Sequence, residues 1–355
     1  MARYNIIGTM SGTSLDGLDI AYCSFEFLEN KWTYKIIEAQ TINFPTKLKD
    51  NLKSGIDISG LELMKLHNEL GQFIGQSTTA FIRQKNINQT EIDCISSHGH
   101  TIFHQPELNL TTQIGNGANI SVITKLPVIC DFRTADIALG GQGAPLVPIG
   151  DKLLFSEYDY CINLGGIANI SFTHNSERNA FDVCPVNIVL NKLSQELGLE
   201  YDKGGEKAKS GKIDINLLTQ LNSLTYYQEQ HPKSLGIEWI TKKVFPIIKN
   251  SKNTIENKLC TFVEHIAIQI SKNIKSEKSS ALITGGGTYN SYLLERIKVN
   301  TTNKIIIPTT TIIDFKEALI FSFLGVLRIR NEINCLKSVT GATKDNIGGC
   351  IYETF

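Results

Sequence analysis

The order of apolar and polar residues divides the first half of the chain into short alternating segments and one long helical segment. Alternation is typical of strands, because successive side chains of a strand point to opposite faces of a sheet. Three alternating segments follow one another before the first helix, which predicts an antiparallel meander. In the helical segment, apolar residues recur every three or four positions. The predicted strands are 4–8, 15–25, 33–44, 94–103 and 126–132, and the predicted helices are 61–83 and 119–124.

The second half of the chain repeats this order of strands followed by helices. A chain of 355 residues also exceeds what a single core usually holds. We therefore predict an α/β protein with an internal duplication, in two domains, 1–150 and 151–355, with the Gly/Pro-rich segment 140–148 as the joint. The last residues either pack back on the first domain or are loose. The predicted strands are 158–164, 167–174, 179–185, 280–284 and 304–308, and the predicted helices are 186–197, 237–248, 257–272 and 315–331.

Composition and charge exclude several classes of function. The 35 basic and 35 acidic residues cancel, and no basic stripe stands out, so we expect no nucleic-acid partner. No apolar run approaches the length of a membrane helix, and no signal peptide opens the chain, so we expect no membrane association. The eight cysteines form no C-x-x-C pair and lie in apolar surroundings, which favours free thiols in the cytoplasm.

Three glycine-rich turns follow predicted strands and are candidates for binding a nucleotide. The first, "GTMSGTSLDGLD", has more hydroxyl and carboxylate side chains than a turn needs. Backbone N–H groups at such turns can bind phosphate, although "LGG" by itself also fits an ordinary hairpin. "TGGGTYN" leaves room for a flat group such as adenine. The candidate residues are Gly12, Thr13, Ser14, Leu15, Asp16, Gly17, Leu18, Asp19, Gly165, Gly166, Gly285, Gly286 and Gly287.

Asp182 is the candidate catalytic residue, because it ends a short apolar strand just before a proline that can start a helix. We expect the N-terminus of that helix to favour the ionised carboxylate. His98 and His100 share one face of the predicted strand 94–103, where they could bind a sugar, a phosphate or, with His104, a metal ion. Arg133 offers a planar fork for a carboxylate or phosphate.

In these motifs and several others, the sequence resembles the anhydro-N-acetylmuramic acid kinase family. The resemblance extends from Gly8 to Ala342 and rests on motifs in the family's order, of which "MSGTSLDG" and "GGQGAPLVP" are the most specific. It implies two ribonuclease-H-like domains of the actin and hexokinase type, with ATP in an interdomain cleft. The remaining motifs are "SHGHTIFHQP", "QIGNG", "DFRTADIALGGQGAPLVP", "NLGGIANIS", "KSLGIEW", "TGGGTYN" and "VTGA".

The resemblance implies that ATP and water convert 1,6-anhydro-N-acetylmuramic acid to N-acetylmuramic acid 6-phosphate and ADP, a step of cell-wall recycling. It makes Asp182 the base, and an amino sugar and ATP the small-molecule partners of a homodimer. We expect Mg²⁺ at the phosphates, near Asp16 or Asp19, and we assign it no direct ligand. Expected contacts to the sugar come from His98, Arg133, Asn187 and Glu317, although Glu317 equally fits a first-turn helix acid.

The sequence departs from the family's pattern at two places. Around the aspartate the family has F-D-T-G-P-G-N, whereas this chain has F-D-V-C-P-V-N, with Val183, Cys184 and Val186 as the changes. His100 stands where the family commonly has Gln. These changes leave the base in place but put the details of the substrate in doubt. The chemistry of the residues assigns no role to "KSLGIEW".

Three other functions fit parts of the sequence. A phosphatase or ATPase of the same superfamily would use the phosphate-binding turns without needing Arg133 or the histidine strand. A sensor of sugar or nucleotide would bind both ligands without turnover. A metal hydrolase would use the three histidines.

Overall fold

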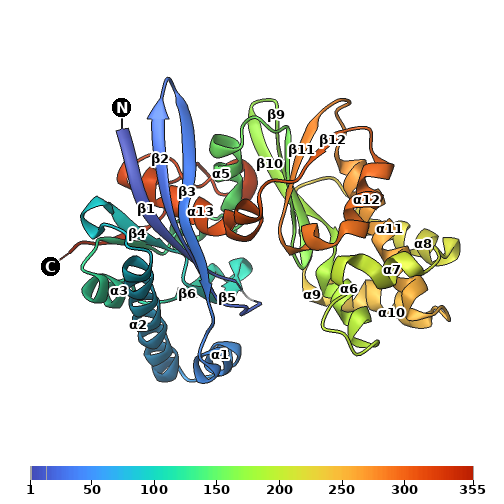
Figure 1. Cartoon of the computed structure of the whole chain (residues 1–355), viewed down its shortest axis with the longest axis horizontal. Coiled ribbons are helices and arrows are strands. Elements are labelled where there is room, and N and C mark those ends of the chain that lie inside the picture. Colours follow the sequence, from blue (N-terminus) through green and yellow to red (C-terminus); the bar gives the residue numbers. More distant parts are fainter. Residues whose placement is uncertain (1, 13, 355) are drawn as a thin grey trace. The chain divides into compact units, whose positions relative to one another are not determined.

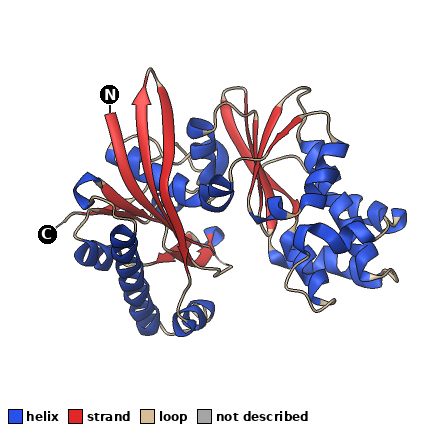
Figure 2. Ribbon diagram, in the orientation of Figure 1, coloured by secondary structure: helices blue, strands red, loops and turns tan. Residues whose placement is uncertain are grey.

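The computed structural model describes residues 2–12 and 14–354, and these form two compact units. The first unit comprises Met1–Leu154 together with Phe315–Phe355, and the second comprises Phe155–Asp314. Within the described residues, no helix has both the length and the apolar composition needed to cross a membrane. Each unit is built around a mixed β-sheet with helices packed on it (Figures 1 and 2).

A six-stranded sheet forms the centre of the first unit (Figure 1). The first three strands of the chain pair antiparallel, the next two extend the sheet in parallel, and the C-terminal strand closes this edge antiparallel. In spatial order the strands are β13 (Cys350–Tyr352), β7 (Val128–Cys130), β4 (Cys94–Ser97), β1 (Ala2–Ser11), β2 (Leu18–Leu28) and β3 (Lys31–Ile42). A separate hairpin joins β5 (His100–Gln105) to β6 (Leu110–Ile114).

Helices cover both faces of this sheet. The face that carries Ile7 and Ile20 packs against α2 (Gly60–Gln84) and α3 (Gly117–Thr124). The opposite face packs against α13 (Thr310–Ile329), because a Cβ atom at Gly8 would overlap Ser322 and the carbonyl of Ala318. The remaining helices of this unit are α1 (Thr46–Lys53), η1 (Gln89–Glu91), η2 (Pro106–Leu108), α4 (Thr134–Ala138), α5 (Val147–Leu154) and α14 (Lys337–Thr340).

The second unit contains a five-stranded sheet and a larger set of helices (Figure 2). Its strands are, in spatial order, β10 (Glu177–Pro185), β9 (Ile167–His174), β8 (Tyr160–Leu164), β11 (Ser280–Thr284) and β12 (Lys304–Ile306). Its helices are α6 (Asn187–Gln195), η3 (Lys203–Gly205), α7 (Glu206–Ser210), α8 (Ile215–Asn222), η4 (Thr225–Gln228), α9 (Ile237–Trp239), η5 (Ile240–Val244), α10 (Phe245–Asn250), α11 (Ile255–Asn273), η6 (Gly286–Tyr289) and α12 (Ser291–Asn300).

The two sheets share one topology, which confirms the predicted duplication and the ribonuclease-H-like fold class. Numbered within each unit, and leaving out the β5–β6 hairpin and β13, the strands lie in the order third, second, first, fourth, fifth. In both units the first three are antiparallel and the last two run parallel to the first. The hydrophobic alternation in each half of the chain therefore corresponds to the five strands that the two sheets have in common.

The division of the chain differs from the expected domains 1–150 and 151–355. From Phe315 onward the C-terminal segment belongs to the first unit, where Lys316 forms a buried ion pair of 2.7 Å with Asp151. The segment 140–148 is not the joint but lies inside the first unit, where Gln142 N–H donates to the Thr340 carbonyl at 2.9 Å. Apolar residues of α13 complete the first core, so sequence order does not mark the domain boundary.

Candidate functional site

The first glycine-rich turn lies between β1 and β2, and Gly12 and residues 14–17 of it are described. Leu15 N–H donates to the Gly12 carbonyl at 3.1 Å, and the Leu15 side chain is buried at a positive φ of 56°. At Gly17 a Cβ atom would lie 2.6 Å from Thr41 Cγ2, so close packing on β3 requires glycine there. Ser14 and Asp16 point to solvent. The candidate Thr13 lies outside the described residues.

Strand β2 begins at Leu18, three residues later than the predicted segment 15–25. Leu18 is buried in the core of the first unit, so its side chain is not available to a ligand. The backbone of the preceding loop and the carboxylate of Asp19 remain as candidate groups. Asp19 Oδ1 accepts a hydrogen bond of 2.6 Å from the Thr41 hydroxyl.

Glu317 on α13 lies near two other candidate residues of the first unit. It is exposed to solvent, yet enough protein surrounds it that desolvation raises its pKa. The Arg133 guanidinium opposes this rise in pKa, and the negative charge of Asp19 adds to it. Glu317 therefore interacts electrostatically with both Asp19 and Arg133.

Arg133 and His98 form a directly bonded pair. His98 Nε2 accepts from Arg133 Nε at 3.2 Å and from Nη2 at 3.0 Å. Because a guanidinium has no acceptor, Nε2 is unprotonated, and Nδ1 carries the proton that it donates to the Gly99 carbonyl at 3.0 Å. Burial, and then the charge of Arg133, hold the His98 pKa well below its ordinary value, so this imidazole stays neutral.

The guanidinium of Arg133 keeps donors available for a ligand. A third N–H, on Nη1, donates to the Gly143 carbonyl at 2.7 Å. Five N–H groups less these three leave two, one on each terminal nitrogen. Desolvation lowers the Arg133 pKa to about 10, and nearby Glu317 opposes that change, so the group remains a cation at neutral pH.

The three histidines do not converge, which corrects the expected strand 94–103. The chain turns at Gly99, where φ is +71°, and this separates β4 from β5. His98 bonds Arg133, His100 Nδ1 lies 2.9 Å from Ser11 Oγ, and His104 Nδ1 lies 3.3 Å from Thr111 Oγ1. Across residues 2–12 and 14–354 there is no group of three or more His, Cys, Asp or Glu side chains that could hold a metal ion.

In the second unit the Gly165–Gly166 turn between β8 and β9 faces the start of α6. The Gly166 carbonyl accepts from Val186 N–H at 2.9 Å and the Gly165 carbonyl from Asn187 N–H at 3.3 Å. The Asn187 side chain donates to the Leu164 carbonyl at 3.3 Å. The predicted ligand residue Asn187 therefore also fixes this turn against α6.

A pocket of about 480 Å³ opens beside the triple glycine of the second unit, a volume typical of small-molecule sites. A Cβ atom at Gly287 would lie 2.7 Å from Leu164 Cβ, whereas Gly286 has open space. Gly285 has a φ of +85°, which favours glycine. Gly286 lines the pocket, and Gly285 and Gly287 instead pack on Leu164. The other lining residues are Asn187, Leu190, Asn191, Tyr201, Asp202, Lys203, Gly204, Tyr289 and Asn290.

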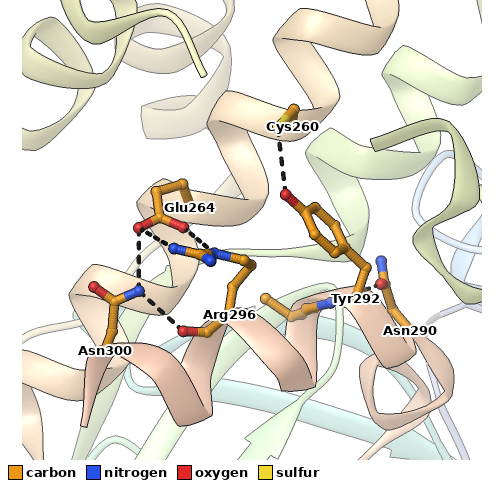
Figure 3. A network of polar contacts seen from close by, with 7 residues as sticks. Cys260, Glu264, Asn290, Tyr292, Arg296 and Asn300 are labelled. Atoms are coloured by element: carbon orange, nitrogen blue, oxygen red, sulfur yellow. Dashed lines mark hydrogen bonds and ion pairs between the residues drawn. The ribbon is translucent and has the colours of Figure 1, made fainter. Parts of the chain in front are cut away.

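A polar network joins α11 to α12, the helix that follows the pocket residue Asn290 (Figure 3). Glu264 on α11 accepts from Arg296 at 2.6 and 3.2 Å and from Asn300 at 3.1 Å. The pocket residue Asn290 caps α12 by accepting from Leu293 N–H at 2.9 Å. The network fixes α12, and through its cap the edge of the pocket.

Asp182 lies inside β10, at a bulge between Asp182 and Cys184, rather than at the end of the strand. Its Oδ2 accepts from Leu235 N–H at 2.8 Å. Burial raises the pKa of Asp182 and this N–H lowers it, with burial the larger effect. The net direction is opposite to the expected influence of the helix N-terminus, because the carboxyl lies in a partly desolvated place.

The three departures from the family's pattern beside Asp182 are core residues. Val183, Cys184 and Val186 are at most 1% exposed and belong to the hydrophobic core of the second unit. Asp182, at the bulge beside them, is half-buried. The apolar residues at these positions therefore belong to the core beside the strand that carries Asp182.

Sequence reasoning missed two residues that hold the candidate site in place, Leu235 and Asp136. Leu235, in the motif "KSLGIEW", bonds Asp182. Asp136, fully buried, accepts from Gly143 N–H at 2.7 Å and from the Thr340 hydroxyl at 2.9 Å, so it supports the loop whose carbonyl holds Arg133. The motifs "KSLGIEW" and "VTGA" were the available signal, but their partners lie far away in the sequence.

A family model and curated relatives match nearly the whole chain. The family model described as anhydro-N-acetylmuramic acid kinase matches residues 4–354. A protein of Francisella tularensis subsp. novicida with that name is 32% identical, covering 99% of this chain and 99% of its own length. One from Coxiella burnetii is 33% identical, covering 99% and 98%. Among solved structures, the activator of 2-hydroxyisocaproyl-CoA dehydratase from Clostridium difficile with bound ADPNP is 13% identical, with a TM-score of 0.44 over 92% of this chain and 97% of that one.

Proposed function

The chain belongs to the anhydro-N-acetylmuramic acid kinase family, and from this premise we propose how its residues carry out the reaction. The enzyme is a phosphotransferase of peptidoglycan recycling. It uses ATP and water to convert 1,6-anhydro-N-acetylmuramic acid to N-acetylmuramic acid 6-phosphate and ADP. The assignment of the base rests on the Asp182 carboxylate, which is half-buried at a strand bulge and accepts from Leu235 N–H through Oδ2.

The pocket and the glycine-rich turns described above supply candidate groups for ATP. The pocket beside Gly286 holds adenosine, since it has the volume of a small-molecule site and glycine leaves its wall open. In the loop before β2, the backbone N–H groups of residues 14, 16 and 17 bind the β- and γ-phosphates, together with the exposed Ser14 hydroxyl. The backbone N–H groups of the Gly165–Gly166 turn also bind phosphate. The two carbonyls of this turn accept from residues at the start of α6, which holds the turn in place.

The sugar is held by residues of the first unit. The two remaining N–H groups of Arg133 bind the lactyl carboxylate of the muramic acid in a bidentate pair. His98, neutral and fixed in one tautomer, orients that guanidinium. Glu317 accepts a sugar hydroxyl, which its exposed position permits.

The anhydro bridge between C1 and O6 leaves no free 6-hydroxyl, so ring opening and phosphoryl transfer are coupled. Asp182 takes a proton from a water molecule as the water oxygen attacks C1. The C1–O6 bond breaks, and O6 forms its new bond with the γ-phosphorus as the bond from that phosphorus to ADP breaks. A general base typically contributes about 10²- to 10⁴-fold, and positioning of the phosphates supplies much of the rest.

The residues of the first unit fit a magnesium ion bound together with ATP. Asp19 and Glu317 are two carboxylates close enough that the charge of Asp19 contributes to the raised pKa of Glu317. Mg²⁺ prefers such hard oxygen donors and usually binds through one or two carboxylates plus substrate phosphates and water. Asp19 is therefore the residue that would hold it, and the ion would neutralise charge on the phosphates.

We also propose a cytoplasmic homodimer. The use of ATP and the free state of all eight cysteines are typical of the cytoplasm. The dimer rests on the family resemblance, and light scattering on the purified chain tests it directly.

Coupled ADP release with ATP, magnesium and 1,6-anhydro-N-acetylmuramic acid tests the function. We expect sugar-dependent turnover in the wild type and a loss of about 10²-fold or more in Asp182→Asn, because the amide cannot take the proton. Asp159→Asn, in the same unit, is the matched control. If the wild type binds ATP and sugar without turnover, the protein is a sensor. If it releases phosphate at the same rate with and without the sugar, it is a phosphatase or ATPase.

A further inference from the structure

Asp182 is held at three atoms by one segment of the second unit, residues 226–235. Its N–H donates to the Lys233 carbonyl at 3.3 Å, and its carbonyl accepts from the Tyr226 hydroxyl at 2.6 Å. Its carboxylate Oδ2 accepts from Leu235 N–H at 2.8 Å. The position of the carboxylate therefore depends on the conformation of this segment.

The side chain of Lys233 ties the two ends of that segment together. Its ammonium donates to the Tyr226 carbonyl at 2.9 Å. The same ammonium lies 4.5 Å from the centre of the Tyr226 ring and 5.6 Å from that of Phe181, next to Asp182. One hydrogen bond and two cation–π contacts thus fix Lys233 between η4 and β10.

We propose that Lys233 is a positioning residue for Asp182, which it serves by locking segment 226–235 so that Leu235 N–H meets the carboxylate. This inference rests on the proposed role of Asp182 as the base. It gives a physical role to the start of "KSLGIEW". The first residue, Lys233, bonds the Tyr226 carbonyl, and the third, Leu235, donates its N–H to the Asp182 carboxylate. Lys233 touches neither the carboxylate nor the reacting atoms in this role.

The charged and titratable groups around this segment determine which variants can serve as controls. Glu229 and Lys275 act electrostatically on Lys233, and Lys275 also acts on His231. Tyr226 is the titratable group that interacts with Asp182, and burial raises its pKa. Lys275 is exposed, so replacing it removes a positive charge nearby while leaving the Lys233–Tyr226 bond in place.

Lys233→Met retains much of the side-chain length but removes the donors and the charge. We expect kcat to fall by about 10- to 100-fold, because a small displacement of a catalytic group has this effect. We expect KM for ATP to stay within about twofold, since the pocket lies elsewhere in the unit. An N–H bond stabilises the carboxylate and lowers its pKa, so its loss moves the acidic limb of the pH–rate profile to higher pH.

The pKa of Asp182 is measured directly by ¹³C NMR titration of carboxyl-labelled protein, with Asp182→Asn to assign the signal. We expect a rise of about half a unit or more in Lys233→Met and no comparable rise in Lys275→Met. Tyr226→Phe, nearly isosteric, supplies a second variant that loses only the hydroxyl bond to Asp182, and its kcat should also fall. Equal Asp182 pKa values and equal kcat in Lys233→Met, Tyr226→Phe and Lys275→Met would overturn the proposal.

The two hypotheses fail in different ways. If the wild type shows no sugar-dependent turnover, the proposed function is wrong, and the NMR titration still decides whether Lys233 positions Asp182. If the wild type turns over but Lys233→Met and Lys275→Met share one pH–rate profile and one Asp182 pKa, the positioning role alone is wrong. Circular dichroism on each variant establishes that the second unit is folded.

Discussion

The pairing of Arg133 with His98 shows how neighbours fix the chemical state of a single residue. A neutral imidazole accepts from two of the guanidinium nitrogens, and the Gly99 carbonyl fixes its tautomer. The arginine is thereby held in one orientation with two donors left for a ligand. A lysine has no planar fork, so it cannot reproduce both the contact to His98 and the bidentate contact to a carboxylate.

Arg133→Lys should therefore weaken sugar binding more than ATP binding. We expect KM for the anhydro sugar to rise by about 10- to 100-fold, the effect of losing a charge-assisted hydrogen bond, while KM for ATP stays within about twofold. Steady-state kinetics with each substrate varied in turn measures both values. Arg83→Lys, an exposed arginine of the same unit, should behave like the wild type. A parallel rise in both KM values would argue against contact between Arg133 and the sugar.

At the scale of elements, close contact between α13 and β1 decides which segment completes the first core. Gly8 permits this contact, since α13 passes directly over it. Ser96 on β4 donates to the Phe321 carbonyl at 2.5 Å, which fixes the same helix over the next strand. A helix far along the sequence thus becomes part of the unit that begins the chain.

Gly8→Ala should destabilise the first unit. The added methyl group would overlap the backbone carbonyl of Ala318, which cannot rotate away as a side chain could. We expect a loss of about 1–3 kcal/mol in the free energy of unfolding, the usual cost of overpacking. Gly60→Ala is the control, because no atom lies within 4 Å of a Cβ there. Urea unfolding of both variants measures the difference, and equal midpoints would contradict the packing argument.

Helical segments show where the hydrophobic pattern is sufficient and where it fails. The predicted helix 61–83 corresponds closely to α2, Gly60–Gln84, which begins with a capping box between Ser59 and Glu62. The predicted helix 237–248 instead consists of α9, the π-helical η5 and α10. Pro246 lies at the start of α10 and has no N–H to donate, so regular hydrogen bonding cannot continue through it.

At the scale of the whole molecule, the second unit is continuous in sequence and the first is not. Residues 155–314 carry a complete sheet and core, whereas residues 1–154 lack α13. Phe321 and Phe323 of that helix are fully buried. Without them the sheet face at Gly8 would be exposed to water.

The fragment 155–314 should therefore fold alone, and the fragment 1–154 should not. The physical reason is the loss of the apolar area that α13 buries against the first sheet. Thermal unfolding followed by circular dichroism should show a cooperative transition for 155–314 only. Adding residues 315–355 to the first fragment through a flexible linker should restore its transition. A cooperative transition in 1–154 by itself would show that α13 is dispensable.

The sequence by itself determined the α/β class, the duplication and the family. Strand alternation depends on local periodicity, and long motifs such as "MSGTSLDG" are read directly from the chain. The position of Asp182 within the second half also followed from the sequence. These features depend on neighbouring residues, so a linear pattern contains them.

Only the tertiary structure decided which distant groups meet. Because the chain turns at Gly99, His98 bonds Arg133 and His100 bonds Ser11. Alternation alone would place both histidines on one face of a strand. Burial sets the direction of the Asp182 pKa, and segment 226–235 supplies the contacts to its backbone and carboxylate. Contacts across tens or hundreds of residues follow from packing of the completed sheets, and local periodicity contains no information about them.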